Sequence, residues 1–346
     1  MTKIACFGGS FNPPHLGHLK IALTVLRQEH FDEVWFLPTL STPLKKNPMA
    51  SFEDRLQMLE LLIKPYRKLK VCTIEESLPL PNYTINTVRA LHSIYPNHHF
   101  TWIIGSDQSV QFSQWKDHET LLTLVDFMVV VREIDETLHP AMKVIRIPGI
   151  EQFSSTNIRS GKLKDTTPEI IRYIFDHELY MESIARSMVS ERRWQHTKQV
   201  EKLALELAAI HHLDPHHVRV SALFHDCTKN WIRDISTQWL MRIDPTYLTM
   251  PSAIWHQKTA EAYLKSLGIK DKVILDAIGH HVVGQKGHPV SQVIFIADKC
   301  EPTRDYDPSQ ELALARIDLD AAAELVRQKQ QEYIQKEINA KSTTSD

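Results

Sequence analysis

Cysteine is scarce in this chain of 346 residues, which has four that lie far apart in the sequence. Their spacing matches neither a zinc ribbon nor the disulfide framework of a small secreted protein. No apolar run reaches the length of a membrane span, and no charged and then apolar leader precedes the first apolar segment. We therefore expect a protein of the reducing cytoplasm that does not enter a membrane.

A strong charge of one sign is also missing. The formal net charge is −2, and no long basic run occurs, which argues against broad binding of nucleic acid. A small anionic ligand, recognised by local clusters of donors and cations, fits this charge balance better than a polymer does. The sequence leaves open whether the chain forms a homo-oligomer.

The length exceeds the size at which a single hydrophobic core keeps growing, so two domains are expected. In residues 1–184, apolar strand candidates alternate with helical stretches, which predicts an α/β Rossmann-like domain with a parallel sheet. Residues 185–338 show only helical periodicity and predict an all-α domain, and residues 339–346 are expected to form a disordered tail. The strand candidates are Lys3–Phe7, Val34–Leu37, Val71–Ile74, Phe100–Ile104, Phe127–Val131 and Val144–Ile147.

The most informative segment lies between the first strand candidate and the first helix candidate. It reads Gly8-Gly9-Ser10-Phe11-Asn12-Pro13-Pro14-His15-Leu16-Gly17-His18. Glycines in such a turn let the backbone approach a phosphate, and the N-terminus of the next helix offers free N–H groups. The two imidazoles add donors on one side. Because ligands of a parallel sheet bind at the carboxyl ends of its strands, the segment predicts a nucleotide triphosphate site.

A second motif, Phe153-Ser154-Ser155-Thr156-Asn157-Ile158-Arg159, follows late in the first domain. By itself it indicates a capped helix start as readily as a site that presents donors and a cation. Together, the two motifs resemble those of the nucleotidyltransferase superfamily with the His-x-Gly-His signature, and specifically those of nicotinate mononucleotide adenylyltransferases. The resemblance covers roughly residues 1–182.

Segments between the two motifs extend this resemblance. The segment 82–87, Asn-Tyr-Thr-Ile-Asn-Thr, is similar to the family's Ser-Tyr-Thr-x-Asp-Thr but has asparagine in place of both serine and aspartate. Lysines on a loop are usually only solvated, and a buried tryptophan more often belongs to a core. In the context of the family, the resemblance implies a mononucleotide site formed by Thr39, Lys45, Arg55, Thr84, Asp107 and Trp115.

The family resemblance also implies the chemistry. No residue is arranged as an activated nucleophile with its own base, so the substrate itself must attack. In this family the 5′-phosphate of the mononucleotide attacks the α-phosphorus of ATP, which Mg²⁺ accompanies. His18 would stabilise the α-phosphate and the transition state, and His15 would contact the triphosphate. The implied ATP site comprises Gly8, Gly9, Ser10, Phe11, His15, His18, Ser155, Thr156 and Arg159.

Other acceptors stay open for the first reaction. Adenylation of nicotinamide mononucleotide is one of them, since a carboxylate and a carboxamide can differ by one donor in the pocket. Adenylation of pantetheine phosphate and cytidylyl transfer are two more, and the motif Ser154–Arg159 speaks against cytidylyl transfer.

In the second half, histidines and aspartates lie on apolar helical faces. His196 shares its face with Val200 and Leu203, and His256 shares one with Ala260. A single residue of this kind is more often a hydrogen-bonded core residue. Several inward imidazoles and carboxylates in one helical domain usually need a metal ion or a partner to offset their desolvation. The set is His196, His225, Asp226, His256, His281 and Asp298.

The order of these residues resembles that of the HD superfamily of metal-dependent phosphohydrolases. The segments 225–229, 277–284 and 297–304 are most similar to symmetrical diadenosine tetraphosphate hydrolases, and the resemblance covers about residues 187–335. It implies an HD domain in which the six residues hold one or two ions of Fe, Mn, Co or Zn. Asp226 and Lys229 would be catalytic, and Lys229 and Arg304 would contact substrate phosphates.

The sequence therefore predicts a bifunctional enzyme. The first domain would join ATP and nicotinate mononucleotide into deamido-NAD and release pyrophosphate, a step of NAD biosynthesis. The HD domain would cleave diadenosine tetraphosphate into two molecules of ADP. Two alternatives remain: an HD domain that only senses nucleotides or dimerises, and a chain that binds nucleotides as a non-enzymatic regulator. Nucleic acid and membranes are not expected partners.

Overall fold

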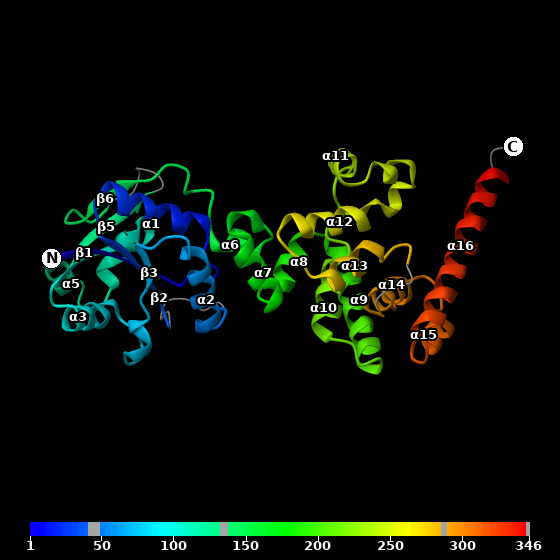
Figure 1. Cartoon of the computed structure of the whole chain (residues 1–346), viewed down its shortest axis with the longest axis horizontal. Helices are drawn as coiled ribbons and strands as arrows, with labels where there is room; N and C mark the ends of the chain where they lie inside the picture. The colour runs from blue at the N-terminus through cyan, green and yellow to red at the C-terminus, as the bar shows by residue number, and fades with distance from the viewer. Residues whose placement is uncertain (41–48, 132–137, 285–288, 344–346) are drawn as a thin grey trace. The chain divides into compact units, whose positions relative to one another are not determined.

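The computed structural model describes residues 1–40, 49–131, 138–284 and 289–343 (Figure 1). The chain divides into two compact units, Met1–Tyr173 and Ile174–Asp346. Strands occur only in the first unit of the described chain, and the second is helical, which confirms the predicted order of fold classes. The division lies before the predicted boundary at 184/185, because α8 (Met181–Ser187) packs on α10 (Pro215–Phe224) of the second unit.

The first unit is built on a six-stranded parallel sheet with the order β3-β2-β1-β4-β5-β6. The strands carry continuous apolar runs, as expected where helices cover both faces of a sheet. The strand order reverses between β1 and β4, and a crevice at the carboxyl ends of these strands is where such a sheet binds ligands. The strands are β1 (Thr2–Gly9), β2 (Glu33–Pro38), β3 (Leu69–Val71), β4 (His98–Gly105), β5 (Asp126–Val131) and β6 (Lys143–Arg146).

The predicted strand Val71–Ile74 is only partly right. β3 ends at Val71, and a 3-10 turn, η1, spans Ile74–Ser77. The reason is local: β3 is an edge strand paired on one side by three residues, so little holds the chain extended beyond Val71. The turn places Glu75 in the interior.

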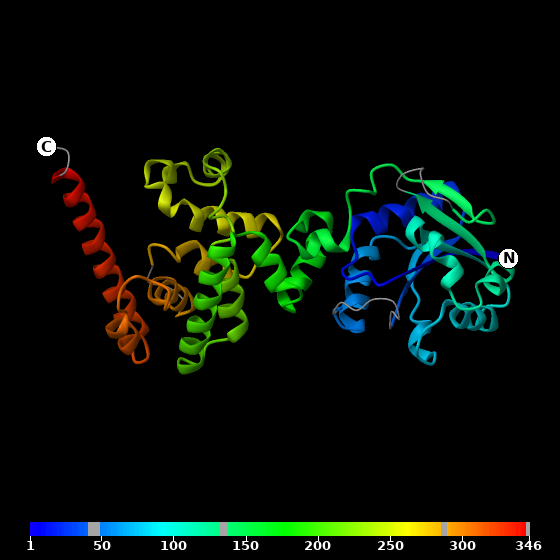
Figure 2. The same cartoon turned by 180° about the vertical axis from the view of Figure 1, so that it is seen from behind.

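One apolar cluster of the first unit joins the sheet to the helices on one of its faces. Its buried members include Trp35 and Phe100 from the strands, Val88 and Leu91 from α3, and Leu121 from α5. Figure 2 shows the same sheet and helices from behind. The helices are α1 (Leu16–Gln28), α2 (Phe52–Ile63), α3 (Thr84–Ile94), α4 (Ser106–Val110), α5 (His118–Leu124), α6 (Ser155–Arg159) and α7 (Pro168–Asp176), with 3-10 turns η2 (Phe112–Gln114) and η3 (Leu163–Asp165).

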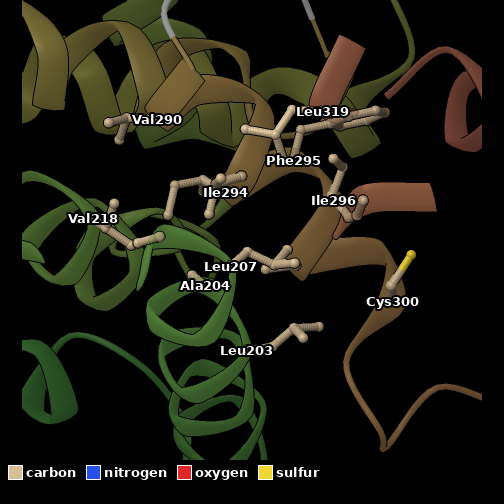
Figure 3. Packing of buried hydrophobic residues seen from close by; sticks show 14 of the residues in the cluster. Leu203, Ala204, Leu207, Val218, Val290, Ile294, Phe295, Ile296, Cys300 and Leu319 are labelled. Atoms are coloured by element: carbon tan, nitrogen blue, oxygen red, sulfur yellow. The ribbon is translucent and has the colours of Figure 1, made fainter. Parts of the chain in front are cut away.

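In the second unit, helices α9, α10, α13, α14, α15 and α16 contribute to an apolar cluster, shown in Figure 3. Leu207 of α9, Val218 of α10 and Ile294 of α14 meet there, and burying each such side chain stabilises the fold by roughly 1.5–3 kcal/mol. Besides α8 and α10, the helices of this unit are α9 (Glu191–Ile210), α11 (Arg233–Ile243), α12 (Trp255–Ser266), α13 (Lys272–His280), α14 (Pro289–Cys300), α15 (Ser309–Ala315) and α16 (Leu319–Thr343), with 3-10 turns η4 (Pro245–Thr249) and η5 (Ser252–Ile254).

Helix α16 includes residues 339–343, which the sequence assigned to the tail. No glycine or proline follows Leu319, so no residue of the segment forces the helix to end earlier. None of the described helices is both long enough and apolar enough to cross a membrane. The four cysteines are free thiols.

Candidate nucleotide and metal sites

A cavity of about 560 Å³ opens at the carboxyl ends of β1 and β4, where the strand order reverses. Phe7 of β1 and Gly105 of β4 line it, together with His15, His18 and Asp107. Two residues of the predicted ATP site and one of the predicted mononucleotide site thus share one cavity. This is the position that the doubly wound topology favours for a nucleotide.

His15 and His18 cap the N-terminus of α1. The backbone N–H of His18 donates to Nδ1 of His15 over 3.3 Å, and the backbone N–H of His15 donates to Nδ1 of His18 over 3.1 Å. The first N–H groups of a helix have no acceptor within the helix, so side chains complete them. Because each Nδ1 accepts a hydrogen bond, the proton of each neutral ring lies on Nε2. Both imidazoles are therefore Nε2–H donors, which suits a phosphate.

The packing around these imidazoles requires a glycine between them. The two rings stack with centroids 3.6 Å apart. A Cβ on Gly17 would lie 2.8 Å from Cβ of Phe153 and 2.9 Å from Nδ1 of His15. The sequence analysis did not name Gly17 or Phe153 as site residues, although both stand inside the two motifs and both line the cavity.

The glycine turn of the opening motif is also tight. A Cβ on Gly9 would lie 3.0 Å from the ring of Phe11, and that ring packs edge-on against His18 with centroids 4.9 Å apart. Phe11 itself has a φ of 46°. Gly8 is less constrained, since a Cβ there would make only an ordinary contact with Trp102 at 3.5 Å.

The late motif lies directly against the loop that follows β1. Oγ of Ser155 donates to the carbonyl of Pro13 over 2.8 Å, and Nη1 of Arg159 donates to the carbonyl of Asn12. Nη2 of Arg159 donates to Oγ1 of Thr156 over 3.2 Å. The two motifs, more than 130 residues apart in the sequence, therefore form one structure, with Ser154 as the N-cap of α6.

The predicted mononucleotide residues are more dispersed. Arg55 is buried and donates to the carbonyl of Ser10 over 2.8 Å, so its guanidinium holds the opening loop. The backbone N–H of Thr39 donates to the carbonyl of Gly9 over 3.0 Å. Trp115 packs on Phe112 and Phe127 of the core, Thr84 begins α3, and Lys45 lies outside the described residues. Among those described, Asp107 is the one that lines the cavity.

A buried carboxylate near this site, Glu75, was missed by the sequence analysis. Its oxygens accept from Oγ1 of Thr87 over 3.2 Å and from the backbone N–H of Leu40 over 3.4 Å. Burial raises the pKa of Glu75, and these two hydrogen bonds and Arg55 only partly counteract it. No periodic signal marks Glu75, because it lies in a 3-10 turn.

The predicted metal ligands gather in the second unit from five helices. Four are on or directly after α9, α10 and α12, and the other two are on or directly after α13 and α14. Each side chain is at least nine-tenths buried. The residues are His196 on α9, His225 and Asp226 after α10, His256 on α12, His281 after α13 and Asp298 on α14.

Two groups of three side chains could each hold a metal ion: His196, His225 and Asp298, and His225, Asp226 and His281. In the first, Nε2 of His196 lies 3.0 Å from Oδ1 of Asp298. In the second, Nε2 of His225 lies 3.4 Å from Oδ2 of Asp226, whose Oδ1 lies 3.6 Å from Nε2 of His281. The shared His225 and the two-sided contacts of Asp226 join the groups into one centre.

Two imidazoles of these groups, those of His225 and His281, turn Nδ1 toward backbone carbonyls. Nδ1 of His225 lies 2.7 Å from the carbonyl of Ala222, and Nδ1 of His281 lies 2.7 Å from that of Ile278. A carbonyl only accepts, so in the neutral form of each ring the proton lies on Nδ1 and Nε2 carries the lone pair that a metal ion would need. Within the described chain, Nε2 of His225 is buried without a hydrogen bond and lies 3.4 Å from Oδ2 of Asp226. A cation fits this orphaned acceptor.

His256 is arranged differently from the other ligand candidates. Its Nδ1 lies 3.1 Å from the ammonium of Lys229, and its Nε2 lies 3.1 Å from Oδ1 of Asp226 and 3.1 Å from Nε2 of His281. The ammonium can only donate, so Nδ1 accepts and the ring proton faces Asp226. The structure thus brings His256 to the centre, but beside the two groups and with the opposite proton arrangement.

Burial and charge fix the protonation of this centre. Burial lowers the pKa of His256 and, with help from neighbouring histidines, lowers that of His281 to about 4. Burial alone would raise the pKa of Asp226, but His225 and the other imidazoles hold it well below its usual range. At neutral pH His256 and His281 are therefore neutral and Asp226 is ionised. His225 differs, because burial lowers its pKa but Asp226 and Asp298 raise it more, so a metal ion that binds its Nε2 competes with a proton.

Cations and a further carboxylate surround the ligands. Arg193 donates to Oδ2 of Asp226 over 2.9 Å, Lys299 donates to Oδ2 of Asp298 over 2.8 Å, and Glu301 lies 3.0 Å from Nδ1 of His196. The sequence analysis assigned no role to these three. The available signals were the helical spacing from Arg193 to His196 and the adjacency of Lys299 and Glu301 to Asp298. Burial lowers the pKa of Lys229, and the positive charges of Arg193 and Lys299 lower it further.

Comparisons with known proteins agree with this division. Residues 6–161 match the family model described as cytidylyltransferase-like, and residues 193–303 match the HD domain. A "probable nicotinate-nucleotide adenylyltransferase" of Methylacidiphilum infernorum is 37% identical over 188 residues, which cover 52% of this chain and 92% of that protein.

Two relatives extend over both units. A "probable nicotinate-nucleotide adenylyltransferase/Ap4A hydrolase" of Mycoplasma genitalium is 30% identical over 342 residues, which cover 94% of this chain and 93% of that protein. A protein of Mycoplasma pneumoniae with the same name is 27% identical and covers 87% and 89%, respectively. The similarity thus includes the order of both domains. The chain belongs to the nicotinate-nucleotide adenylyltransferase/Ap4A hydrolase family, in which a cytidylyltransferase-like domain precedes an HD domain.

Proposed function

We propose that the first unit transfers the adenylyl group of ATP to nicotinate mononucleotide, giving deamido-NAD and pyrophosphate. The observation that carries this proposal is the pair of capping imidazoles, His15 and His18, which line a cavity at the strand-order reversal. Relatives that align with this unit bear the name of this activity.

The reaction needs alignment and charge stabilisation rather than an enzyme nucleophile. An oxygen of the mononucleotide 5′-phosphate bonds to the α-phosphorus of ATP while the bond between that phosphorus and the β-phosphate oxygen breaks. His18 donates to the α-phosphate as its charge grows, and His15 donates to the triphosphate. Mg²⁺, when bound with ATP, supplies further charge neutralisation. The glycine turn (Gly8, Gly9, Ser10, Phe11) and Ser155, Thr156 and Arg159 hold the triphosphate.

The mononucleotide binds on the β4 side of the cavity, where Asp107 belongs to its site. Thr39, Lys45, Arg55, Thr84 and Trp115 complete that site directly or through the loops that they hold. Incubating the full chain with ATP, Mg²⁺ and nicotinate mononucleotide tests the proposal through release of pyrophosphate and formation of deamido-NAD. Nicotinamide mononucleotide in a parallel reaction measures the preference, and no product from either would refute the assignment.

The second unit, as we propose it, hydrolyses diadenosine tetraphosphate into two molecules of ADP. The orphaned Nε2 of His225 and the two groups that share this ring carry the assignment. When bound, one or two ions of Fe, Mn, Co or Zn would supply an activated water and neutralise phosphate charge. The residues that would hold these ions are His196, His225, Asp226, His281 and Asp298. His256, which lies beside the two groups, would complete the set.

The chain's own groups prepare this site. Asp226 joins the two groups of ligands, and Glu301 fixes the ring of His196 through its Nδ1. Lys229 adds a cation for the substrate phosphates, and Arg304 holds Asp298 by donating to its carbonyl and carboxylate. An oxygen of water bonds to an inner phosphorus, and the central phosphoanhydride bond breaks.

The test uses chelator-treated protein reloaded with Mn²⁺ and diadenosine tetraphosphate as substrate. ADP as the sole product supports symmetrical cleavage. Equal amounts of AMP and ATP would contradict it, and an inert but metal-loaded protein would favour a nucleotide-sensing HD domain instead.

A further inference from the structure

Two cations at the metal centre have donors that no contact of the described chain uses. Arg193 reaches Asp226 through Nη1 alone, although a guanidinium carries five N–H donors. Lys299 reaches Asp298 through one ion pair. Their side chains are 30% and 20% exposed, whereas the carboxylates that they contact are 4% and 6% exposed. Each cation therefore contacts a buried ligand carboxylate while its own side chain is partly exposed.

The cations named from the sequence are more committed. Nε and Nη2 of Arg304 donate to the carbonyl of Asp298, and Nη2 also donates to its carboxylate. The ammonium of Lys229 contacts the carbonyl of Ala253 and Nδ1 of His256. These contacts make Arg304 a residue that holds the turn after α14. They leave Arg193 and Lys299 as the better placed groups for an incoming phosphate.

The placement of the pair also suits an extended substrate. Arg193 precedes His196 by one helical turn on α9 and contacts the Asp226 side of the centre, while Lys299 is on α14 and contacts the Asp298 side. A substrate phosphate held at the metal centre would have Arg193 on the Asp226 side and Lys299 on the Asp298 side. Phosphates on both sides of the scissile bond could then each meet a charge-assisted donor.

We propose that Arg193 and Lys299 form a phosphate-binding pair that selects polyphosphate chains extending on both sides of the scissile bond over simple phosphodiesters. This inference rests on the proposed hydrolase function and names the feature of the substrate that its site reads. Arg193, with a planar fork, binds one flanking phosphate in two-point fashion, and Lys299 binds the other as a point charge.

The experiment compares Arg193→Ala, Arg193→Lys and Lys299→Ala in the full, Mn²⁺-loaded chain. Arg192→Ala is the matched control, because Arg192 is the adjacent, exposed residue on α9. We expect Arg193→Ala and Lys299→Ala to lower kcat/KM for diadenosine tetraphosphate by about 10–100-fold, the usual value of a charge-assisted hydrogen bond. Cleavage of bis(p-nitrophenyl) phosphate, which has no flanking phosphate, should fall by a clearly smaller factor, and that factor measures the part of the loss that comes through the ligand carboxylates. Arg193→Lys should recover part of the loss.

Two measurements without turnover separate this role from simple support of the metal ligands. Calorimetry should show the same Mn²⁺ stoichiometry in all variants, and binding of inorganic pyrophosphate to the Mn²⁺ form should weaken about tenfold or more in the alanine variants. Equal losses with both substrates, or a loss of Mn²⁺, would overturn the proposal. If the unaltered chain fails to cleave diadenosine tetraphosphate, the hydrolase function falls, while pyrophosphate binding still decides the role of the pair.

Discussion

The histidine rings of the two sites make opposite hydrogen bonds at Nδ1. In the first unit, His15 and His18 accept backbone N–H groups at Nδ1 and so present Nε2–H donors. In the second unit, His225 and His281 face backbone carbonyls with Nδ1 and so present Nε2 lone pairs. The end of the helix decides which, because free N–H groups occur at a helix N-terminus and free carbonyls at a C-terminus. Donors suit phosphate, and lone pairs suit metal.

The two sites also differ in how far apart in the sequence their residues lie. The capping pair lies within four consecutive residues and is supported by one helix start, whereas the metal centre draws on five helices. A change at the capping pair should therefore affect one reaction through its phosphate contacts. A change at the metal centre should affect a whole set of ligands at once.

The largest expected effect follows from removing Asp226. Asp226→Ala takes away the carboxylate that joins the two groups of ligands, so hydrolysis of diadenosine tetraphosphate should fall by about 10³-fold or more, as for other groups around which a site is built. Adenylyl transfer should stay within about twofold. Metal analysis should show the loss of bound ion. Asp234→Ala, at an exposed position of α11, is the control, and a fall in both activities would mean that the sites are not independent.

The next effect concerns the donor role of His18. His18→Ala should lower kcat for adenylyl transfer by about 10²–10³-fold, the range seen when one donor to a developing oxyanion is lost. Because alanine also removes the cap, His18→Glu is measured beside it: glutamate at this position restores a capping box but offers no donor and repels phosphate. Both variants should be inactive, while His18→Glu should melt nearer to the unaltered chain. An active glutamate variant would reduce His18 to a capping residue.

A smaller effect is expected from crowding the capping pair. Gly17→Ala places a Cβ 2.8 Å from Cβ of Phe153 and 2.9 Å from Nδ1 of His15, which should destabilise the first unit by about 1–3 kcal/mol. KM for ATP should rise as His15 moves. Thermal unfolding and initial rates measure the two consequences, and hydrolysis by the second unit serves as the internal control. Unchanged ATP kinetics would show that His15 need not hold this position.

The smallest expected effect concerns one of two buried carboxylates, Glu75 and Asp226, whose pKa values are shifted in opposite directions. Burial raises the pKa of Glu75 above 4.5, whereas neighbouring imidazoles lower that of Asp226. The folded state then holds the proton on Glu75 more tightly than the unfolded state, so stability from this group is lost as pH rises from about 4.5 through the folded pKa. In Glu75→Gln this slope should disappear from the unfolding of the first unit. Glu76→Gln, an exposed neighbour, should keep it.

Much of the first site could be predicted because its residues are neighbours in the sequence. A strand, a glycine turn and two histidines at a helix start are local patterns, and the structure joins them as expected. Arg55 and Trp115 were also predicted for the mononucleotide site, and the structure places the guanidinium of Arg55 against the carbonyl of Ser10 and the ring of Trp115 against Phe112. Their place depended on how α2 and the segment after α4 pack, which no local pattern reports.

At the metal centre, apolar helical phase was enough to indicate that His196, His281 and Asp298 face inward. It did not show that His256 would meet the ammonium of Lys229, or that Arg193 and Lys299 would each hold a ligand carboxylate. Periodicity identifies the buried face of one helix. It contains no information on which residues of another helix that face meets.

The sequence by itself determined the order of two fold classes, the strand and helix that flank the opening motif, and the residue types of both sites. These depend on hydrophobic period, on turn residues and on the fixed chemistry of imidazole and carboxylate. Only the tertiary structure decided the proton arrangement of each histidine and the partners of each cation. Both are set by the atoms within hydrogen-bonding distance, and those atoms come from segments that only packing brings together.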